Sequence, residues 1–81
     1  KAKTLEKQTI SVSIDKDIKY YIDAEQVDVE NIEQLIMTAV RGTEEPAIIL
    51  HADKSVDIEH VVKIMDIAYR NKYKIVLATK P

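Results

Sequence analysis

The chain has no cysteine, tryptophan or phenylalanine, and it contains one glycine and two prolines among its 81 residues. Without cysteine there is neither a disulfide framework nor a thiolate metal site. A single glycine cannot build a glycine-rich phosphate loop, and neither a Walker pattern nor a Ser/His/Asp arrangement occurs. The aromatic residues are only four tyrosines, too few for the stacked aromatic set of an RNA-recognition sheet. These absences argue against an enzyme and against a nucleic-acid-binding protein.

Charge and hydrophobicity set further limits on the class of protein. The net charge of −2 is opposite to that of a surface with clustered Lys and Arg for nucleic acid. No apolar run approaches the ~20 residues that cross a bilayer. The apolar fraction of 46%, with 32% charged residues, is typical of one folded domain, which at this length hides roughly 60% of its unfolded surface.

The N-terminal third of the chain predicts a linker followed by a β-hairpin. Residues 1–8 are polar and charged, which is typical of a linker. Apolar and polar residues then alternate over 9–14 and again over 18–23, which predicts two strands, each with one buried face. Asp15-Lys16-Asp17 supplies the turn, and Asp17 is the residue we expect to be left-handed.

Two amphipathic helices are expected. The first begins after Asp28, a suitable N-cap, and ends before Gly42, whose position requires positive φ. The second runs from about Val56 or Asp57 to Asn71, and Ile67 falls on its polar side. The expected buried face of the second helix consists of Ile58, Val61, Val62, Met65, Ala68 and Tyr69, widened by Ile64.

Apolar runs at 47–50 and 74–79 flank the second helix, and a strand–helix–strand unit of this length forces its two strands to lie parallel. The element order β-β-α-β-α-β predicts a two-layer α/β (α+β) sandwich with both helices on one face of a mixed sheet. Strand parity sends Ile48 and Leu50 to one face and Ile49 and His51 to the other, so both faces carry apolar residues. The face without helices is either an interface with another chain or a mixed surface.

Two clusters of polar residues could be mistaken for sites. His51, Asp53, Asp57 and His60 lie within ten residues of one another, but a strand and a helix direct their side chains apart. We therefore expect no metal site. Asp53 follows a strand at the edge where open α/β sheets bind ligands, so a small-ligand-binding domain is one alternative. The simpler interpretation of Asp53 is a turn carboxylate that caps the helix or bonds loop amides.

Binding through the main chain is the remaining hypothesis. A small sheet leaves at least one edge strand whose amide and carbonyl groups can accept an extended peptide or the same segment of a second copy. We expect partner binding along the edge of the first two strands, at Ser11, Ser13 and Tyr21. Leu77 in the last strand and Asp53 at the sheet end are the other two candidates. Leu77 has an equally good explanation as a core residue.

Residues 47–79 resemble the periplasmic domain of the ExbD/TolR family. The residues that carry the resemblance are Ala52-Asp53-Lys54, Val62, Met65-Asp66, Tyr73 and the strand from Lys74 to Leu77. The chain departs from the family pattern at His51, Ile58 and Lys72, where the family often has arginine, an aromatic residue and glycine. Without that glycine, Asn71 or Lys72 must take the left-handed position after the helix, and asparagine tolerates it better.

The resemblance implies a non-enzymatic domain over residues 9–81 that has no cofactor and forms a homodimer, with exchange of the N-terminal strand as one route. It also implies a periplasmic domain, joined by the linker 1–8 to a preceding inner-membrane helix. The implied partners are an ExbB/TolQ-like membrane protein that uses the proton motive force and a TonB-like or TolA-like protein that serves outer-membrane nutrient import. TolR-type members also engage peptidoglycan. Envelope maintenance of that type is therefore an alternative, as is a stand-alone homodimeric adaptor.

Overall fold

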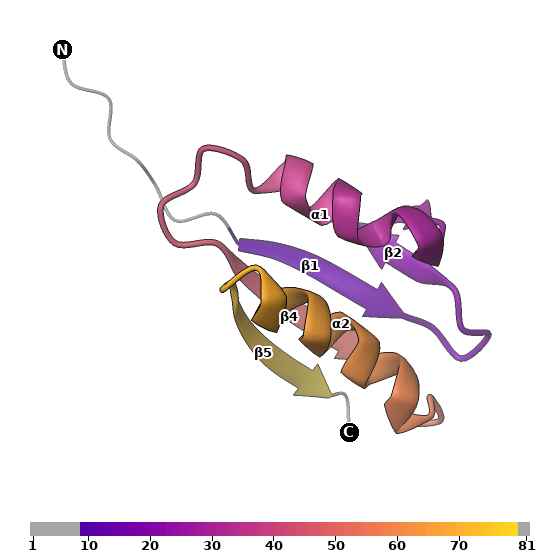
Figure 1. The fold of residues 1–81 in the computed structure, drawn as a ribbon. Coiled ribbons are helices and arrows are strands. Elements are labelled where there is room, and N and C mark those ends of the chain that lie inside the picture. Colours follow the sequence, from indigo (N-terminus) through magenta and orange to yellow (C-terminus); the bar gives the residue numbers. More distant parts are fainter. Residues whose placement is uncertain (1–8, 80–81) are drawn as a thin grey trace, which may run out of the picture.

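The computed structural model describes residues 9–79, which form a five-stranded sheet with two helices on one face (Figure 1). The helices are α1 (Ile32–Ala39), preceded by the 3₁₀ turn η1 (Val29–Asn31), and α2 (Ile58–Arg70). The strands are β1 (Thr9–Ile14), β2 (Tyr20–Ile22), β3 (Glu25–Val27), β4 (Ala47–Ala52) and β5 (Lys74–Thr79). The predicted two-layer α+β sandwich is confirmed. The predicted linker, residues 1–8, lies outside the described residues.

The sheet is mixed, with the strand order β3-β2-β1-β4-β5. β1 pairs antiparallel with β2 and parallel with β4, and β4 pairs parallel with β5 as the strand–helix–strand unit predicted. β1 is therefore the central strand. The expectation that the first two strands form an edge is wrong, because both have neighbours on each side.

The strand that covers β2 is β3, which the sequence pattern did not reveal. β2 and β3 are joined by Asp23 and Ala24, whose φ angles of 49° and 77° are both positive. This is the geometry of a two-residue type I′ hairpin turn, which usually takes Asn-Gly or Asp-Gly. Alanine in the second position removes the glycine that would have marked the turn. As a result Tyr21 lies on an interior strand, and so do Ser11 and Ser13.

The turn between β1 and β2 also differs from the prediction, because Ile18 and not Asp17 has positive φ (60°). Asp15 Oδ1 accepts the backbone N–H groups of Asp17 at 2.9 Å and Lys19 at 3.0 Å. The amide of Asp15 donates to the carbonyl of Lys19 and closes the loop. Because Asp15 binds the amides of the residues before and after Ile18, the chain reverses at Ile18.

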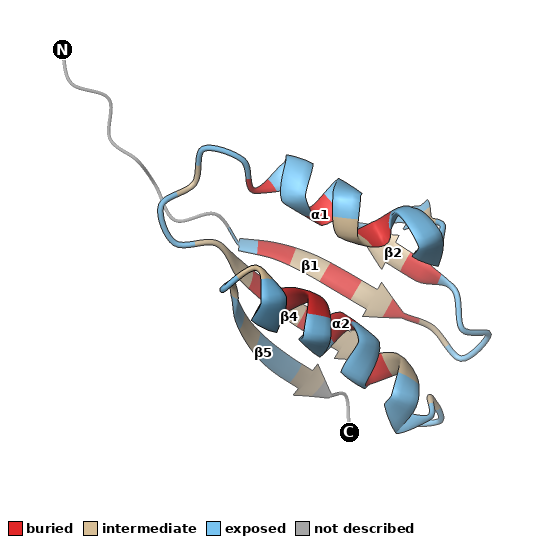
Figure 2. Ribbon diagram, viewed as in Figure 1, coloured by how far each residue is buried: buried red, intermediate tan, exposed pale blue. Residues whose placement is uncertain are grey.

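The core lies between the sheet and the helices. Ile10, Val12 and Ile14 of β1 and Ile48 and Leu50 of β4 face the helices and are buried, as the parity predicted, while the residues between them are partly buried (Figure 2). Burying such an aliphatic side chain contributes about 1.5–3 kcal/mol relative to leaving it exposed. The buried residues are Ile10, Val12, Ile14, Tyr20, Ile32, Ile36, Val40, Ile48, Leu50, Val61, Ile64, Ile67 and Ala68.

α2 buries a different face from the predicted one. Val61, Ile64 and Ala68 are buried as expected, and Ile67, which was predicted on the polar side, joins them in the core. The other predicted core positions of this helix are exposed: Ile58, Val62, Met65 and Tyr69. Apolar residues occupy well over half of the helix circumference, so the 3.6-residue period alone cannot decide which part faces the sheet.

A residue with positive φ follows each of the two helices. Gly42 after α1 has φ 79°, as predicted. After α2 the left-handed residue is Lys72 (φ 61°), whereas Asn71 was expected. Asn71 instead directs its side-chain amide to the carbonyl of Ile67 at 2.8 Å. The amides of the next two residues donate to the carbonyls of Tyr69 and Ala68, which is the Schellman pattern.

Candidate partner-binding surfaces

The sheet ends in two edges of different character. β3 has three residues, of which Glu25 and Gln26 are exposed, and it lies between Asp23 and Asp28. β5 has six residues, and within residues 9–79 no strand pairs with its outer side. Short length and charge are the usual protection of an edge strand against pairing with other chains. β3 has both protections, whereas the middle of β5 is the uncharged run from Ile75 to Ala78.

β5 exposes an apolar side chain on each face of the sheet. Leu77 is opposite Leu50 and belongs to the helix side, but it is 47% exposed. Val76 is opposite Ile49 on the open face and is 59% exposed. Leu77 is therefore not a core residue, and its predicted role in partner binding remains a prediction.

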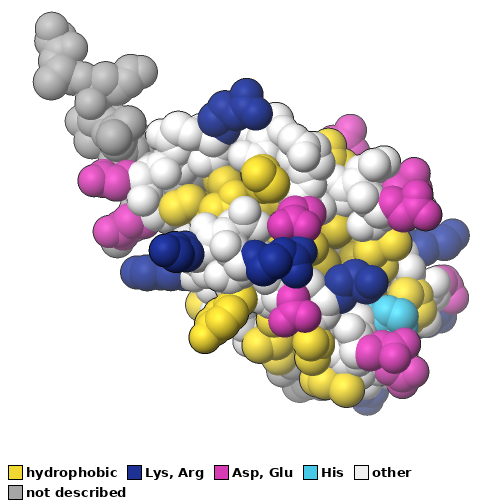
Figure 3. Space-filling view, in the orientation of Figure 1, with side chains coloured by type: hydrophobic (Ala, Val, Ile, Leu, Met, Phe, Trp, Pro, Cys, Tyr) yellow, Lys and Arg dark blue, Asp and Glu magenta, His cyan; other side chains and the backbone are white. Residues whose placement is uncertain are grey.

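α2 carries an apolar stripe on its solvent side, which we call the outer stripe: Ile58, Val62, Met65 and Tyr69. The spacing of four, three and four residues places these side chains on one helical face. Ile58 is 69% exposed and Tyr69 is 89% exposed. α2 packs over β4 and β5, and Figure 3 shows apolar side chains gathered along α2 and toward β5.

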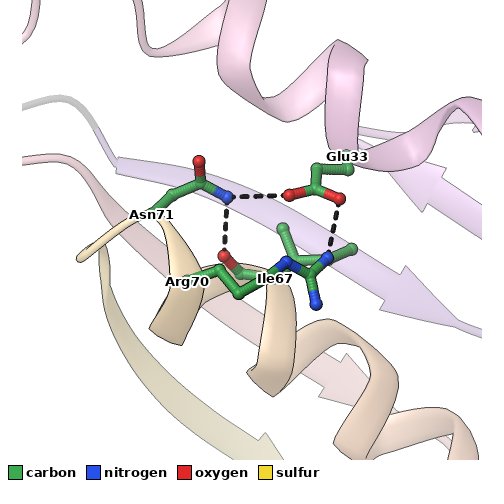
Figure 4. A network of polar contacts seen from close by, with 4 residues as sticks. All are labelled: Glu33, Ile67, Arg70 and Asn71. Carbon is green, nitrogen blue, oxygen red and sulfur yellow. Dashed lines mark hydrogen bonds and ion pairs between the residues drawn. The ribbon is translucent and has the colours of Figure 1, made fainter.

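The side of α2 next to the outer stripe that faces α1 is charged and borders a groove of about 500 Å³ between α1 and α2. Arg70 Nη2 donates to Glu33 Oε1 at 2.7 Å, and Asn71 Nδ2 donates to Glu33 Oε2 at 3.0 Å (Figure 4). The hydrogen bond from Arg70, followed by that from Asn71, lowers the pKa of Glu33, and the same bond to Glu33 raises the pKa of Arg70. Since both partners are more than a third exposed, this bridge contributes about 0.2–1 kcal/mol.

A second hollow, of about 420 Å³, lies on the open face of the sheet at the carboxyl ends of β1 and β4. The strand registers place Tyr21, Ser13 and His51 side by side on three adjacent strands. Asp53 lines the same hollow. Three of the predicted partner-binding residues, Ser13, Tyr21 and Asp53, therefore meet at one place, while Ser11 and Leu77 do not line it. No sequence signal identified His51 as their neighbour, because only the parallel register of β1 and β4 brings it there.

Hydrogen bonds fix the polar groups around this hollow. Asp53 Oδ2 accepts both the amide and the hydroxyl of Ser55, and the amide of Asp53 donates to the carbonyl of Ile14. The expectation that Asp53 bonds loop amides is confirmed, and the Ser55 bonds lower the pKa of Asp53. The hydroxyl of Tyr21 donates to Asp15 Oδ2 at 2.8 Å, and this bond raises the pKa of Tyr21.

The two histidines lie on opposite sides of the sheet. His51 borders the hollow on the open face, whereas His60 is on α2 with its Nδ1 3.3 Å from the hydroxyl oxygen of Tyr20. Among residues 9–79, no group of three or more His, Cys, Asp or Glu side chains is placed to hold a metal ion. Neither helix in the described part of the chain has the length and hydrophobicity to cross a membrane.

The chain is similar to a known protein family and to curated proteins. The family model described as biopolymer transport protein ExbD/TolR matches residues 1–81. Curated relatives from two strains of Helicobacter pylori, each described as a biopolymer transport protein, ExbD-like 2, are 24% identical over 70 residues. The alignment covers 86% of this chain and 50% of each relative, so the chain spans about half the length of these relatives.

Proposed function

Since this chain belongs to the ExbD/TolR family of biopolymer transport proteins, we propose that it is a non-enzymatic coupling domain whose β5 edge pairs with a strand of another chain. The observation that carries the proposal is the contrast between the two edges: β5 is long and apolar, and no strand within residues 9–79 pairs with its outer side, whereas β3 is short and acidic. A long apolar edge exposes the protein to aggregation unless another strand covers it.

The proposed setting is the periplasm, with the domain anchored to the inner membrane by a helix that contacts an ExbB/TolQ-like protein. That complex would use the proton motive force, and the domain would pass force to a TonB-like protein for nutrient import across the outer membrane. Family membership supports this setting, and the ExbD-like description of both relatives favours it over TolR-type envelope maintenance with a TolA-like partner or peptidoglycan.

In the resting state, two copies of the domain pair through β5, and their outer stripes extend the contact. An added strand places alternate side chains on the two faces of the sheet. On the helix side its side chains would meet Leu77 and the outer stripe, and on the open side they would meet Val76. Proton-driven repositioning of the two copies would separate the edges, and a segment of the partner protein would then occupy β5.

NMR titration tests this assignment directly. The isotope-labelled domain is mixed with an extended peptide from a TonB-like linker, and shifts are expected at Val76, Leu77 and the outer stripe. A matched peptide with alternate backbone amides N-methylated has the same side chains but cannot complete the main-chain ladder, so it should not bind. Equal binding of both peptides, or shifts confined to β3, would contradict the proposal. Shifts confined to Asp53 and Ser55 with a small molecule would favour a ligand-binding domain instead.

A further inference from the structure

The hollow on the open face exists because a small residue stands between two rings. Tyr21, Ser13 and His51 are in register on β2, β1 and β4, so Tyr21 and His51 are separated by two strand spacings, roughly 9–10 Å. Ser13 between them leaves a slot into which one flat group can fit with a ring on either side. The volume of about 420 Å³ lies within the range of sites for small ligands or single side chains.

The walls of the slot are held in place before any ligand arrives. Tyr21 is fixed through its hydroxyl by Asp15, and Asp15 is fixed by the two amides of its own loop. Asp53 is fixed by Ser55 on the other side. A site whose side chains are already immobilised loses less conformational entropy when it binds.

The polar groups at the rim are mostly acceptors. Asp15 and Asp53 are carboxylates with lowered pKa values, and Lys54 is the cation that lines the hollow with them. Lys16 and Asp17 of the adjoining turn carry opposite charges that offset each other. The rim therefore has a net negative charge. Carboxylate oxygens accept more than one hydrogen bond each, and the oxygen of Tyr21 can still accept one after donating to Asp15.

We propose that this hollow is a binding site for the guanidinium group of an arginine in a partner's extended segment. Guanidinium is planar, stacks on aromatic faces and donates two parallel hydrogen bonds to a carboxylate, whereas an ammonium group offers only a compact point charge. The slot between the two rings and the carboxylate of Asp53 match these properties. An anionic group would be repelled by the rim, and a neutral group would leave the rim charge uncompensated.

The partner is a polypeptide segment because the hollow is continuous with an apolar strip. One step back along the strands, the register places Ser11, Ile49 and Val76 in the next row on the same face. A segment that crosses the open face would therefore seat an apolar residue on Ile49 and Val76 and an arginine in the hollow. This site goes beyond the proposed pairing at β5 and does not depend on it.

The experiment compares N-acetyl-arginine amide with the isosteric but neutral N-acetyl-citrulline amide and with N-acetyl-lysine amide, by NMR titration of the full 81-residue chain. The arginine probe is expected to bind with a millimolar Kd and to shift Ser13, Tyr21, His51 and Asp53. Lysine should bind at least threefold more weakly and citrulline at least fivefold more weakly. Equal affinity for citrulline and arginine, or shifts spread over the helix side, would overturn the proposal.

Variants separate a specific site from general charge attraction. Asp53→Asn should raise the Kd for the arginine probe at least fivefold, while Asp66→Asn, the same charge change on the helix side, should change it by less than twofold. Ser13→Leu fills the slot without a change in charge and should abolish binding. An equal loss in the Asp53 and Asp66 variants, or retained binding in the Ser13 variant, would overturn the proposal. If Asp53→Asn disturbs the loop around Asp53, the Ser13 variant still tests the site, because it leaves that loop unchanged.

Discussion

The two ends of the sheet differ in length, in charge and in what accompanies them. β3 has three residues, turns sharply out of β2 through Asp23 and Ala24, and exposes Glu25. β5 has six residues, exposes Val76 and Leu77, and is accompanied by the outer stripe of α2. Both ends belong to one small sheet, so size or topology cannot explain the difference. The proposed function rests on this difference, since it assigns partner binding to the β5 edge and none to the β3 edge.

The largest effect is expected from a charge placed on β5. Val76→Lys should weaken self-association or peptide binding by about thirtyfold or more, since pairing would bury an unpaired ammonium group; thirtyfold corresponds to about 2 kcal/mol. Sedimentation over a concentration series measures the change. Val76 is 59% exposed, so the fold should be retained.

Gln26→Lys is the matched control, because it places the same charge on the exposed face of the other edge. It should leave association unchanged within twofold. If the β3 variant weakens association as much as the β5 variant does, the contrast between the two edges has no functional meaning.

The second effect concerns the helices that accompany the two edges. Tyr69→Ala removes the most exposed ring of the outer stripe and should weaken association about tenfold, with little change in the free energy of unfolding. Met37→Ala truncates a partly exposed apolar residue on α1 and should leave association unchanged. Equal effects of the two substitutions on the measured Kd would show that the outer stripe is no more important for association than any other exposed apolar residue. That result would contradict its proposed role in the contact.

Each edge strand follows a turn that contains non-glycine backbone in the left-handed region. Ala24 (φ 77°) lies between β2 and β3, and Lys72 (φ 61°) lies between α2 and β5. Replacement of either residue by glycine should stabilise the protein by about 0.5–1 kcal/mol, because glycine adopts positive φ without steric cost. Urea unfolding of the single variants and of the double variant measures the two gains. They should add, since the two turns are on opposite edges of the sheet.

The smallest effect comes from the bridge between the helices. Glu33→Gln should destabilise the domain by about 0.5 kcal/mol at pH 7 and should not alter association at β5. The bonds from Arg70 and Asn71 lower the pKa of Glu33 in the folded state, so this contribution is present above the ordinary value of 4.5 and is lost as the pH falls below it.

The stability difference between the wild type and the Glu33 variant, followed by urea unfolding from pH 7 to pH 3, should therefore shrink toward zero at the acidic end. Asp15 and Asp53 also have lowered pKa values, but they are present in both proteins and cancel. Glu30→Gln removes a charge from the same groove without this bridge. If the stability difference between the wild type and the Glu30 variant has the same pH dependence, the bridge is not the cause of that dependence.

The features that follow from residue periodicity and from turn residues were predicted correctly from the sequence. Alternation identified β1 and the buried faces of β1 and β4, and Gly42 marked the end of α1. The parallel pairing of β4 and β5 followed from the helix between them. The same reasoning predicted the layers of the fold and the turn at Asp53 after the strand.

The remaining features depend on exceptions to residue preferences or on contacts distant in sequence. The turn at Ala24 lacks glycine, so β3 was missed and the first two strands were taken for an edge. Asn71 is fixed by Glu33 from another helix, which leaves the left-handed position to Lys72. On α2, the choice between Ile67 and Met65 as a core residue depends on where the sheet lies, and the helix sequence does not encode it.

Residue-resolved amide hydrogen exchange, recorded over a concentration series, tests most directly whether β5 is the edge that pairs. Protection of the amides in β5 should increase with protein concentration, while protection of β3 and the loops should not change. Constant protection of β5 up to millimolar concentration, together with rising protection of β3, would contradict it.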